Sequence, residues 1–337
     1  MVLVRPVSRV LVTGGAGFIG SAVVRRLQAA GVEAVGFDRA ADPCDDIGDA
    51  DRLRAALAGS DAVIHLAAKV GLGVSVADID DYVRTNDLGT AVLLRVAAEA
   101  GVARVAYASS MVVYGEGSYR CAEHGAVRPP PRLEEDLRRG RFEPGCPVCG
   151  ADLSPGLVPE NAPFDPRNVY AATKVHGEHL LRSWTRETGV PAIALRFHNV
   201  YGPGLPRDTP YAGVAALFRS ALVNGQPPTV LEDGGQRRDF VHVDDVAAAV
   251  VAALTADVPA GVTALNIGSG HPVTIGEVAT AMSRAMGGPA PVVTGGYRLG
   301  DVRHVTAECS HAQQVLGWRP QIALADGVAD LVTDAVR

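Results

Sequence analysis

The sequence is short of the features that mark membrane, nucleic-acid-binding and secreted proteins. Across 337 residues the formal net charge is −6, so we expect no basic surface for nucleic acid or an anionic membrane. The longest uncharged apolar segment, residues 246–256, is too short to span a bilayer. The chain reaches a glycine turn too soon for a signal peptide to precede it. These absences predict a cytoplasmic protein whose partner is a small molecule.

Cysteine is also scarce, and its spacing needs an explanation. In a reducing compartment the five cysteines are not expected to form disulfides. Three of them and one histidine form two short pairs separated by 21 residues: Cys121 and His124, then Cys146 and Cys149. This spacing is typical of a zinc ribbon, in which two tight turns direct four ligands at one tetrahedral Zn2+. Free thiols and a redox Cys-x-x-Cys are the alternatives. Cys44 and Cys309 lack such partners, and we expect packed thiols there.

Short apolar runs alternate with Ala-, Leu- and Arg-rich helical stretches. The expected strands are 10–13, 34–37, 62–66, 105–109 and 192–196, with helices such as 51–58 and 90–100 between them. This rhythm predicts an α/β fold with a doubly wound parallel Rossmann sheet, whose ligand cleft lies at the carboxyl ends of the strands.

The same pass along the chain suggests a domain organisation. We expect a core made of residues 1–116 and 161–200, interrupted by a zinc-ribbon-like insertion at 117–160 that is rich in Pro, Arg, Gly and Cys. Residues 201–337 are expected to form mainly a smaller, interleaved substrate lobe, with 236–256 returning to the core.

A glycine turn follows the first strand and opens a helix. Gly14, Gly17 and Gly20 are spaced so that backbone amides and the helix N-terminus approach a pyrophosphate; an ordinary tight turn is the alternative. The second strand ends in Asp38, where a carboxylate binds the ribose hydroxyls of NAD and repels the 2′-phosphate of NADP. Asp38 therefore favours NAD, whereas the neighbouring Arg39 is suited to a 2′-phosphate.

A tyrosine and a lysine four residues apart are the candidate catalytic pair. Tyr170 and Lys174 share one face of a predicted helix that continues through residues 176–182. We expect the ammonium to lower the pKa of Tyr170 and make the phenol a general base. Ser110 follows the strand at 105–109, at the end where the cleft is expected, and its hydroxyl suits a substrate oxygen. A solvated Tyr–Lys pair and a turn-capping serine are the alternatives.

Taken in order, these motifs resemble those of the extended short-chain dehydrogenase/reductases, in the nucleotide-sugar epimerase/dehydratase family. Further matching motifs lie at 46–47, 65–68, 85–90, 196–203, 238–245 and 266–268. The resemblance implies cofactor contacts at Gly14, Gly17, Phe18, Ile19, Gly20, Asp38, Asp46, Ile47, Leu66, Ala67, Ala68, Asn86, Tyr170 and Lys174. It implies nucleoside-diphosphate-sugar contacts at Ser110, Asn199, Arg238 and Arg298, since guanidinium groups suit phosphate oxygens.

Two other residues are weaker candidates. Arg303 is suited to the same diphosphate, and its alternative is a surface ion pair. His65 is expected to be a packed histidine at the end of a strand, because the sequence supplies no evident partner.

Two residues separate the branches of the family. Its dehydratases carry an Asp-Glu pair after the catalytic hydroxyl, but Met111 and Val112 stand here and cannot transfer a proton. The resemblance thus implies an NAD-dependent 4-epimerase, an isomerase that acts through a transient 4-keto sugar on a dTDP- or UDP-linked hexose or 6-deoxyhexose. His198, residues 211–215 and the insertion resemble a subgroup that includes dTDP-L-rhamnose 4-epimerases. An NAD(P)H-dependent 4-ketoreductase and a catalytically silent NAD sensor or scaffold are the alternatives.

The resemblance also implies a homodimer. Its members pack the helix after Asn86 and the helix bearing Tyr170 into a four-helix bundle. The apolar residues available for that contact are Leu93, Leu94, Val96, Leu180, Leu181 and Trp184. Burial inside one monomer explains them equally well.

Overall fold

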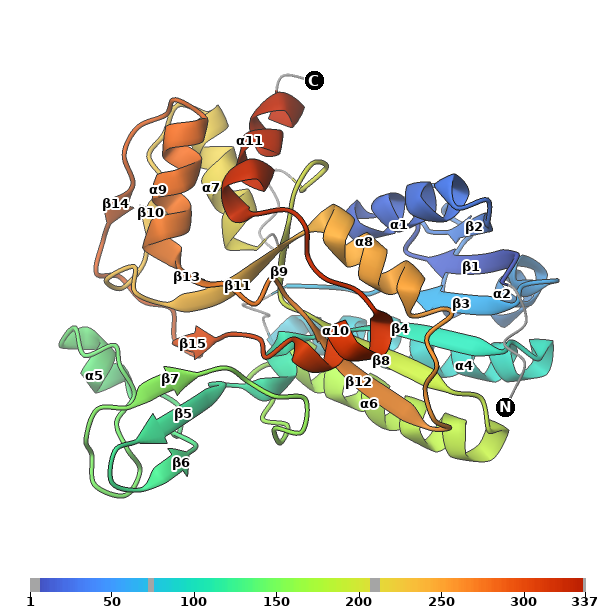
Figure 1. Cartoon of the computed structure of the whole chain (residues 1–337), viewed down its shortest axis with the longest axis horizontal. Coiled ribbons are helices and arrows are strands. Elements are labelled where there is room, and N and C mark those ends of the chain that lie inside the picture. The colour runs from blue at the N-terminus through green and yellow to red at the C-terminus, as the bar shows by residue number, and fades with distance from the viewer. Residues whose placement is uncertain (1–6, 72–75, 207–212, 336–337) are drawn as a thin grey trace.

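The computed structural model describes residues 7–71, 76–206 and 213–335, and its centre is a six-stranded parallel sheet (Figure 1). Its strands are β1 (Arg9–Thr13), β2 (Glu33–Phe37), β3 (Ala62–His65), β4 (Arg104–Ser110), β8 (Ala192–Phe197) and β12 (Val262–Ile267). They lie in the order β12-β8-β4-β3-β1-β2. β2 and β3 flank β1 on opposite sides, so the strand order reverses there and leaves a crevice at the carboxyl ends. The predicted Rossmann-type α/β fold is confirmed.

Helices cover both faces of this sheet. One face carries α1 (Phe18–Ala29), α8 (Val243–Ala252) and α10 (Ser310–Leu316); the other carries α2 (Ala50–Leu57), α4 (Gly89–Ala100) and α6 (Val169–Thr188). Successive strand residues point to opposite faces, so Val10 and Val12 pack with α1 and α8, whereas Leu11 packs with α2 and α4. Because both faces are buried, the strands read as continuous apolar runs, which is why the sequence predicts them well.

The sixth strand, β12, comes from the part of the chain expected to form mainly the substrate lobe. It pairs with β8 from Val262 to Ile267 and closes one edge of the sheet. The helix α8, within the segment 236–256, lies against α1. The chain therefore crosses between lobe and core more than once after residue 200.

The lobe lies at the upper left in Figure 1. It contains β9 (Asn199–Tyr201), α7 (Val214–Val223), β10 (Thr229–Val230), β11 (Arg237–His242), β13 (Pro272–Thr274), α9 (Ile275–Ala285), β14 (Val292–Val293), β15 (His304–Val305) and α11 (Leu324–Ala335). Its apolar core includes Phe218, Phe240, Val278 and Met282. β9 pairs with β11, which places Asn199 beside Phe240 and joins the end of the core to the lobe.

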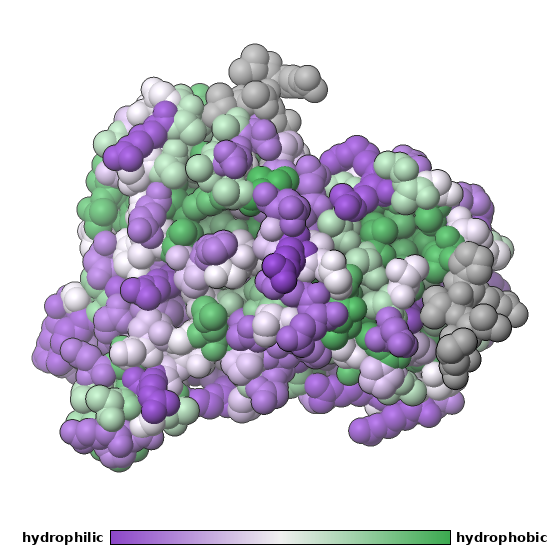
Figure 2. Space-filling model, viewed as in Figure 1, coloured by the Kyte–Doolittle hydropathy of each residue, from purple (hydrophilic) through white to green (hydrophobic). Residues whose placement is uncertain are grey.

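The insertion at 117–160 has regular structure that its sequence pattern does not reveal. β5 (Ser118–Cys121) pairs antiparallel with β6 (Gly125–Val127) and β7 (Ser154–Gly156), and α5 (Glu134–Arg138) follows β6. Its apolar cluster consists of Tyr119, Cys121, Cys146 and Leu153, with Val127 packed against it. At the lower left of Figure 2 its surface is largely hydrophilic. So small a cluster contributes little to holding these strands together.

The residues proposed for the dimer contact are mostly used inside the monomer. Leu93, Leu94, Val96, Leu181 and Trp184 are buried in the core, and Trp184 donates a hydrogen bond to the Leu94 carbonyl at 2.8 Å; Leu180 is partly buried. Packing of α4 against α6 explains their apolar character. The homodimer stays a prediction, and these residues do not support it. None of the helices that the structure describes has the length and apolar character needed to cross a membrane.

Short irregular segments join the core elements near the carboxyl ends of the strands. A 3-10 turn (Val76–Asp78), α3 (Ile79–Tyr82) and a π-helical turn (Val83–Leu88) precede α4, and another 3-10 turn (Met111–Tyr114) follows β4. α6 begins at Asn168, whose side chain accepts a hydrogen bond from the Ala171 N–H at 2.8 Å. It ends at Gly189, in the left-handed region.

A buried ion pair fixes α6 against the sheet. Glu178 on α6 accepts two hydrogen bonds from the Arg196 guanidinium on β8, at 2.8 and 2.7 Å, and one from the Ser109 hydroxyl at 2.6 Å. Arg196 also donates to the Tyr114 hydroxyl, which donates to Asn266 Oδ1 on β12. The two charged side chains are 1% and 0% exposed. The network therefore ties α6 to β4, β8 and β12 through satisfied polar groups.

Replacing Arg196 should destabilise the fold strongly. Arg196→Met leaves the Glu178 carboxylate buried without its partner, so we expect the free energy of unfolding to fall by about 3–5 kcal/mol in urea titrations. The control is Arg95→Met, which removes an exposed helix pair with Glu99 and should cost less than about 0.5 kcal/mol. Equal losses in the two variants would contradict the role given to the buried pair.

Candidate active site

A cleft of about 1400 Å³ opens at the carboxyl ends of the core strands. β1 contributes the glycine turn, β2 contributes Asp38, β4 contributes Ser109 and Ser110, and α6 contributes Tyr170 and Lys174. Other predicted site residues that line it are Phe18, Ile19, Asp46, Ile47, Leu66, Ala67 and Ala68. The structure therefore brings the predicted cofactor and catalytic residues, apart from Asn86, to one place, which the topology locates at the point where the strand order reverses.

The glycines of the turn have different physical roles. Gly14 has a φ of +71°, which favours glycine, and a Cβ there would lie 2.7 Å from the Ala67 nitrogen. A Cβ on Gly20 would lie 1.9 Å from the Gly14 carbonyl oxygen, so this glycine permits close packing of α1 on the turn. The N-terminus of α1 has no side-chain cap and no acidic residue in its first turn. It thus presents backbone N–H groups and a positive dipole end to the cleft.

Asp38 stands beside this turn with its carboxylate already hydrogen-bonded. It accepts from the Ala16 N–H at 3.0 Å and the Ala40 N–H at 2.9 Å. Arg39, the residue that argued for a 2′-phosphate, forms an exposed ion pair with Asp46 at 3.2 Å. Its charge is therefore partly neutralised by a second predicted cofactor residue.

Tyr170, Ser110 and Lys174 meet at the other end of the cleft. The Ser110 hydroxyl lies near enough to Tyr170 to work against the rise in its pKa, and it also caps the turn after β4 by accepting from Val112 N–H at 3.3 Å. Lys174 Nζ donates to the Ala108 carbonyl at 2.8 Å and lies 5.8 Å from the centre of the Tyr170 ring. The serine thus both caps a turn and faces the phenol.

The pKa of Tyr170 differs from the sequence-based expectation. Burial raises the pKa of Tyr170 to about 12, although the hydrogen bond with Ser110 works in the opposite direction. Burial also lowers the pKa of Lys174 to about 8, and the Asp87 carboxylate partly offsets this effect. The expectation that Lys174 lowers the pKa of the phenol is therefore wrong for the polypeptide alone, because desolvation of the phenolate dominates.

His65 has partners that the sequence did not show. Its Nε2 lies 2.9 Å from Thr90 Oγ1, whose own hydrogen is donated to the Asn86 carbonyl, so Nε2 is the donor. Its Nδ1, 2.8 Å from Thr13 Oγ1, then accepts the Thr13 hydroxyl hydrogen. Burial lowers the pKa of His65 to about 3 and keeps the ring neutral, with Lys174 adding to the effect. His65 is a packed histidine that joins β1, β3 and α4.

Asn86 supports the cleft from behind. Its side chain bonds the backbone of Lys69 through both the N–H and the carbonyl, and donates to Thr173 on α6 at 3.0 Å. It is buried and is not among the residues that line the cleft. Asn86 therefore acts as a positioning residue that holds the 66–70 segment against α6.

The predicted diphosphate residues are not equivalent in the structure. Asn199 and Arg238 lie on the paired strands β9 and β11, and Asn199 Oδ1 is buried without a hydrogen-bond partner in the described part of the chain. Arg238 donates to the carbonyls of Val302 and Arg303 at 2.7 and 2.9 Å. Arg298 is exposed, near Asp301.

Arg303 is a correction to the sequence analysis. A surface ion pair was its alternative role, but its side chain is 2% exposed and it pairs with Glu143, Glu232 and Asp233. Glu143 belongs to the insertion and the other two partners belong to the lobe, and all three are at least 70 residues from Arg303 in the sequence. Cys44 is another correction, since it is exposed and not packed, whereas Cys309 is buried.

The predicted metal ligands form one cluster. The ligand atoms of Cys121, His124, Cys146 and Cys149 all lie within 4.8 Å of one another. Cys121 Sγ is 3.7 Å from Cys149 Sγ and 3.5 Å from His124 Nδ1. A tetrahedral zinc with Zn–S bonds of 2.3 Å requires sulfur–sulfur edges of about 3.7 Å. All five cysteines are free, so the cluster is not held by a disulfide.

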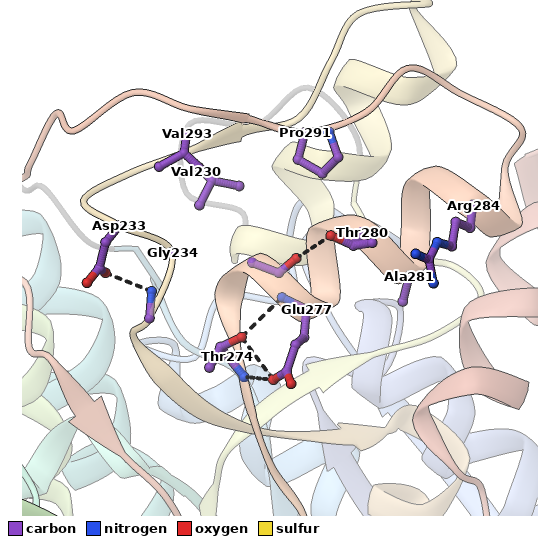
Figure 3. A pocket seen from close by; sticks show the side chains of 12 residues that line it. Val230, Asp233, Gly234, Thr274, Glu277, Thr280, Ala281, Arg284, Pro291 and Val293 are labelled. Atoms are coloured by element: carbon purple, nitrogen blue, oxygen red, sulfur yellow. Dashed lines mark hydrogen bonds between the residues drawn. The ribbon is translucent and has the colours of Figure 1, made fainter.

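A second hollow, of about 540 Å³, lies on the lobe between α9 and the strands β10 and β14 (Figure 3). Its polar groups bond to one another: Thr274 and Glu277 form a capping box, and Thr280 donates to the Gly276 carbonyl. Nothing in this hollow resembles a catalytic set.

Comparisons with known proteins agree with the geometry of the cleft. A model of the NAD dependent epimerase/dehydratase family matches residues 10–144 and 148–268. The chain belongs to this family. It is an enzyme of the nucleotide-sugar epimerase type, as the family resemblance predicts.

Two similar proteins are 4-epimerases. The dTDP-L-rhamnose 4-epimerase of Burkholderia thailandensis is 35% identical over 347 residues, covering 96% of this chain and 94% of that protein. The UDP-glucose 4-epimerase of Mycolicibacterium smegmatis is 35% identical over 346 residues, covering 96% and 97%. Among solved structures, MoeE5 in complex with UDP-glucuronic acid and NAD is 31% identical with a TM-score of 0.77, covering 98% of this chain and 99% of that chain.

Sequence reasoning missed several residues of this epimerase-family cleft. Lys69, Asp81 and Arg84 line it, and Lys69 pairs with Asp81 at 2.8 Å. Lys69 directly follows the predicted 66–68 motif, which was the available signal. The resemblance also used residues 211–215, of which 211 and 212 lie outside the described residues, while His198 lines the cleft.

Acid should destabilise this enzyme through His65. The pKa of the His65 ring is about 6.5 in the unfolded chain, whereas burial lowers it to about 3 in the folded protein. The unfolded state binds more protons in that window, so the free energy of unfolding decreases as the pH is lowered, by up to about 1.4 kcal/mol per pH unit. His65→Gln should remove this one-proton slope in urea titrations between about pH 6 and 4. The exposed His271→Gln is the control, and an unchanged slope in His65→Gln would refute the assignment.

Proposed function

We propose that the enzyme is an NAD-dependent nucleoside-diphosphate-sugar 4-epimerase that acts through a transient 4-keto sugar. The observation that carries this proposal is the meeting of Ser110, Tyr170 and Lys174 at the end of one cleft, with Met111 and Val112 in the turn that follows. The set has a proton-transferring phenol but no acid pair for expelling a second hydroxyl. Hydride transfer at one secondary alcohol fits this set.

The residues of the cleft fit NAD. The uncapped N-terminus of α1 and the turn at Gly14 suit a pyrophosphate, and Asp38 lies where the ribose hydroxyls of NAD bind. Bound NAD would supply a hydride acceptor and donor for the sugar C4 and, in its oxidised form, a positive charge in the cleft. The proposal of NAD over NADP rests on Asp38 together with the exposed Arg39–Asp46 pair.

The chain's own residues carry the proton chemistry. Tyr170 takes the proton from the sugar 4-hydroxyl and returns it after the keto sugar has turned over. Ser110 donates a hydrogen bond that stabilises the phenolate, and a positive charge near the ring lowers the pKa of Tyr170 against the effect of burial. Lys174, anchored to the Ala108 carbonyl, supplies such a charge when protonated. Net inversion at C4 follows.

The proposed substrate class rests on Asn199 and Arg238 and on the relatives, although neither residue, nor Arg298, is among those that line the cleft. Asn199 and Arg238 would bind the diphosphate, and the unpartnered Oδ1 of Asn199 is available to a ligand's hydrogen-bond donor. The relatives named above act on a dTDP-sugar and a UDP-sugar, so a dTDP- or UDP-linked hexose or 6-deoxyhexose is proposed.

The test follows the hydride. An epimerase recycles one hydride within a single visit to the site, so a sugar labelled with deuterium at C4 should give an equilibrium mixture of C4 epimers with the label retained. We expect this from dTDP- or UDP-sugars without added reductant, measured by NMR and mass spectrometry. Tyr170→Phe removes the proton acceptor and should lower turnover by about 10²–10⁴-fold while NAD stays bound.

A different outcome would favour the alternative function. If turnover begins only from a 4-keto sugar and consumes NADH or NADPH stoichiometrically, the enzyme is a 4-ketoreductase. Near-normal turnover in Tyr170→Phe would show that another group is the base. Asp87→Asn separates a loss of charge near the lysine from a loss of the phenol, because the Asp87 carboxylate acts on the pKa of Lys174 and does not line the cleft.

We also propose that the insertion binds one structural Zn2+. The support is the distances among Cys121, His124, Cys146 and Cys149, which match a closed tetrahedral site with no position left for water. Two of these ligands belong to the small apolar cluster of the insertion, so a metal supplies the order that this cluster lacks.

Metal analysis of the purified protein tests the zinc site. We expect one zinc per chain without added metal, and its loss in Cys146→Ser, with proteolysis increased within 117–160 but not in the core. Cys309→Ser, at a buried thiol outside the cluster, is the control and should keep the zinc. Protein purified without chelator that holds no zinc would overturn this proposal.

A further inference from the structure

The insertion extends into the lobe through a buried arginine. Arg132 Nη2 lies 2.9 Å from the Glu232 carboxylate and donates to the Asp301 carbonyl at 2.7 Å; its Nη1 donates to the Phe142 carbonyl. Its side chain is only 4% exposed. Because Glu232 and Asp301 belong to the lobe and Phe142 to the insertion, one guanidinium connects the two.

Glu143 makes a second connection. Its carboxylate accepts from Arg303 Nε at 2.8 Å and lies 2.9 Å from His304 Nε2. Arg303 in turn pairs with Glu232 and Asp233, and its N–H donates to the Glu116 carboxylate at 2.8 Å. The insertion therefore contributes one cation and one anion to a network whose other members are in the lobe and at the end of the core.

Glu232 lies at the centre of this network in a strained conformation. Its φ is +53°, the one positive value among the non-glycine residues that the structure describes. Its buried carboxylate lies 2.9 Å from Arg132 and 2.8 Å from Arg303. Such a conformation persists only where the surroundings hold it. Here the Glu232 backbone bonds to Gly295 and Gly296, and its carboxylate is held by the two arginines.

The network ends at the proposed diphosphate residue. Arg238 donates to the carbonyls of Val302 and Arg303, next to the carbonyl of Asp301 that Arg132 binds. In the described part of the chain no carboxylate forms an ion pair with it. Burial lowers the pKa of Arg238 and the charges of Asp301 and Glu116 only partly offset this, so a bound anion would favour the charged guanidinium. The loop through residues 301–303 therefore receives Arg132 from one side and Arg238 from the other.

The metal cluster is adjacent in sequence to these contacts. Cys146 follows Glu143 by three residues, and Cys121 follows Tyr119 by two. The Tyr119 ring packs on His304, with ring centres 5.9 Å apart. A metal bound by Cys121 and Cys146 would therefore also hold Tyr119 and Glu143, the two insertion side chains that contact His304.

We propose that the insertion is a positioning arm of the sugar-nucleotide site, which orders Arg238 and residues 301–303 through Arg132 and Glu143 when its metal is bound. Metal occupancy would then set the affinity for the nucleoside diphosphate. The inference rests on the proposed function and on the zinc site. No residue of 117–160 is among those that line the cleft, so we expect NAD binding to be unaffected when the arm is disturbed.

Metal removal from the full-length enzyme is the first test. Chelation should weaken binding of dTDP or UDP, measured by calorimetry, by about tenfold, a size typical of coupling between sites. The NAD content, measured after denaturation, should not change. Adding Zn2+ should restore the nucleotide affinity. Unchanged affinity after complete loss of the metal would overturn the proposal.

Variants separate positioning from general damage. Arg132→Gln and Glu143→Gln should each raise the KM for the sugar nucleotide by about tenfold with little change in kcat. Arg132→Lys, which keeps the charge but not the planar fork, should be intermediate. The control is Arg139→Gln, which removes an exposed pair with Glu135 on α5 and should behave as wild type.

The outcomes distinguish a failure of the arm from a failure of the proposed function on which it rests. Wild type that binds neither dTDP nor UDP overturns the proposed function, and the arm falls with it. Wild type that binds one of them, while Arg132→Gln and Glu143→Gln keep its affinity within twofold, overturns the arm alone. If Arg132→Gln loses NAD as well, its fold is damaged. The affinity of Glu143→Gln for dTDP or UDP then tests the arm, because Glu143 is partly exposed and its substitution disturbs the fold less.

Discussion

The candidate site depends on the buried contact between α6 and the sheet. Glu178, Arg196 and Ser109 join the helix that carries Tyr170 and Lys174 to the strands that lead to Ser110 and His198. Two charges out of water gain little net stability, because desolvation costs about as much as their attraction returns. Their effect is on geometry. Glu178 and Arg196 can form their hydrogen bonds in only one register of α6, and that register brings the Tyr170 phenol to Ser110.

Burial determines the protonation of the groups around the cleft. It keeps His65 neutral between two threonine hydroxyls, raises the pKa of Tyr170 to about 12 and lowers that of Lys174 to about 8. The polypeptide alone therefore does not hold a reactive phenolate. Under the proposed function, a positive charge brought by the cofactor would favour the phenolate and so would link proton transfer to cofactor binding.

The insertion shows how a short polar segment is made part of a site. Its apolar cluster is small and includes two of the candidate metal ligands, so its order depends on those ligands and on contacts with the lobe. Arg132 and Glu143 supply those contacts, and they lead to Glu232, Arg303 and the carbonyls that Arg238 binds. If the proposed metal site and arm hold, the insertion and this side of the site become ordered together.

The sequence by itself determined the five core strands β1 to β4 and β8, the glycine turn, the Ser–Tyr–Lys set and the spacing of the metal ligands, but not the strands β5 to β7 of the insertion. These follow from local rules: strand burial, the backbone freedom of Gly14, and ligand pairs in tight turns. Only the tertiary structure decided that Arg303 is buried, that Cys44 is exposed, that Leu93 and Trp184 pack inside the monomer and that the pKa of Tyr170 rises. Burial and ion pairing depend on residues distant in sequence, which the pattern around a single residue does not contain.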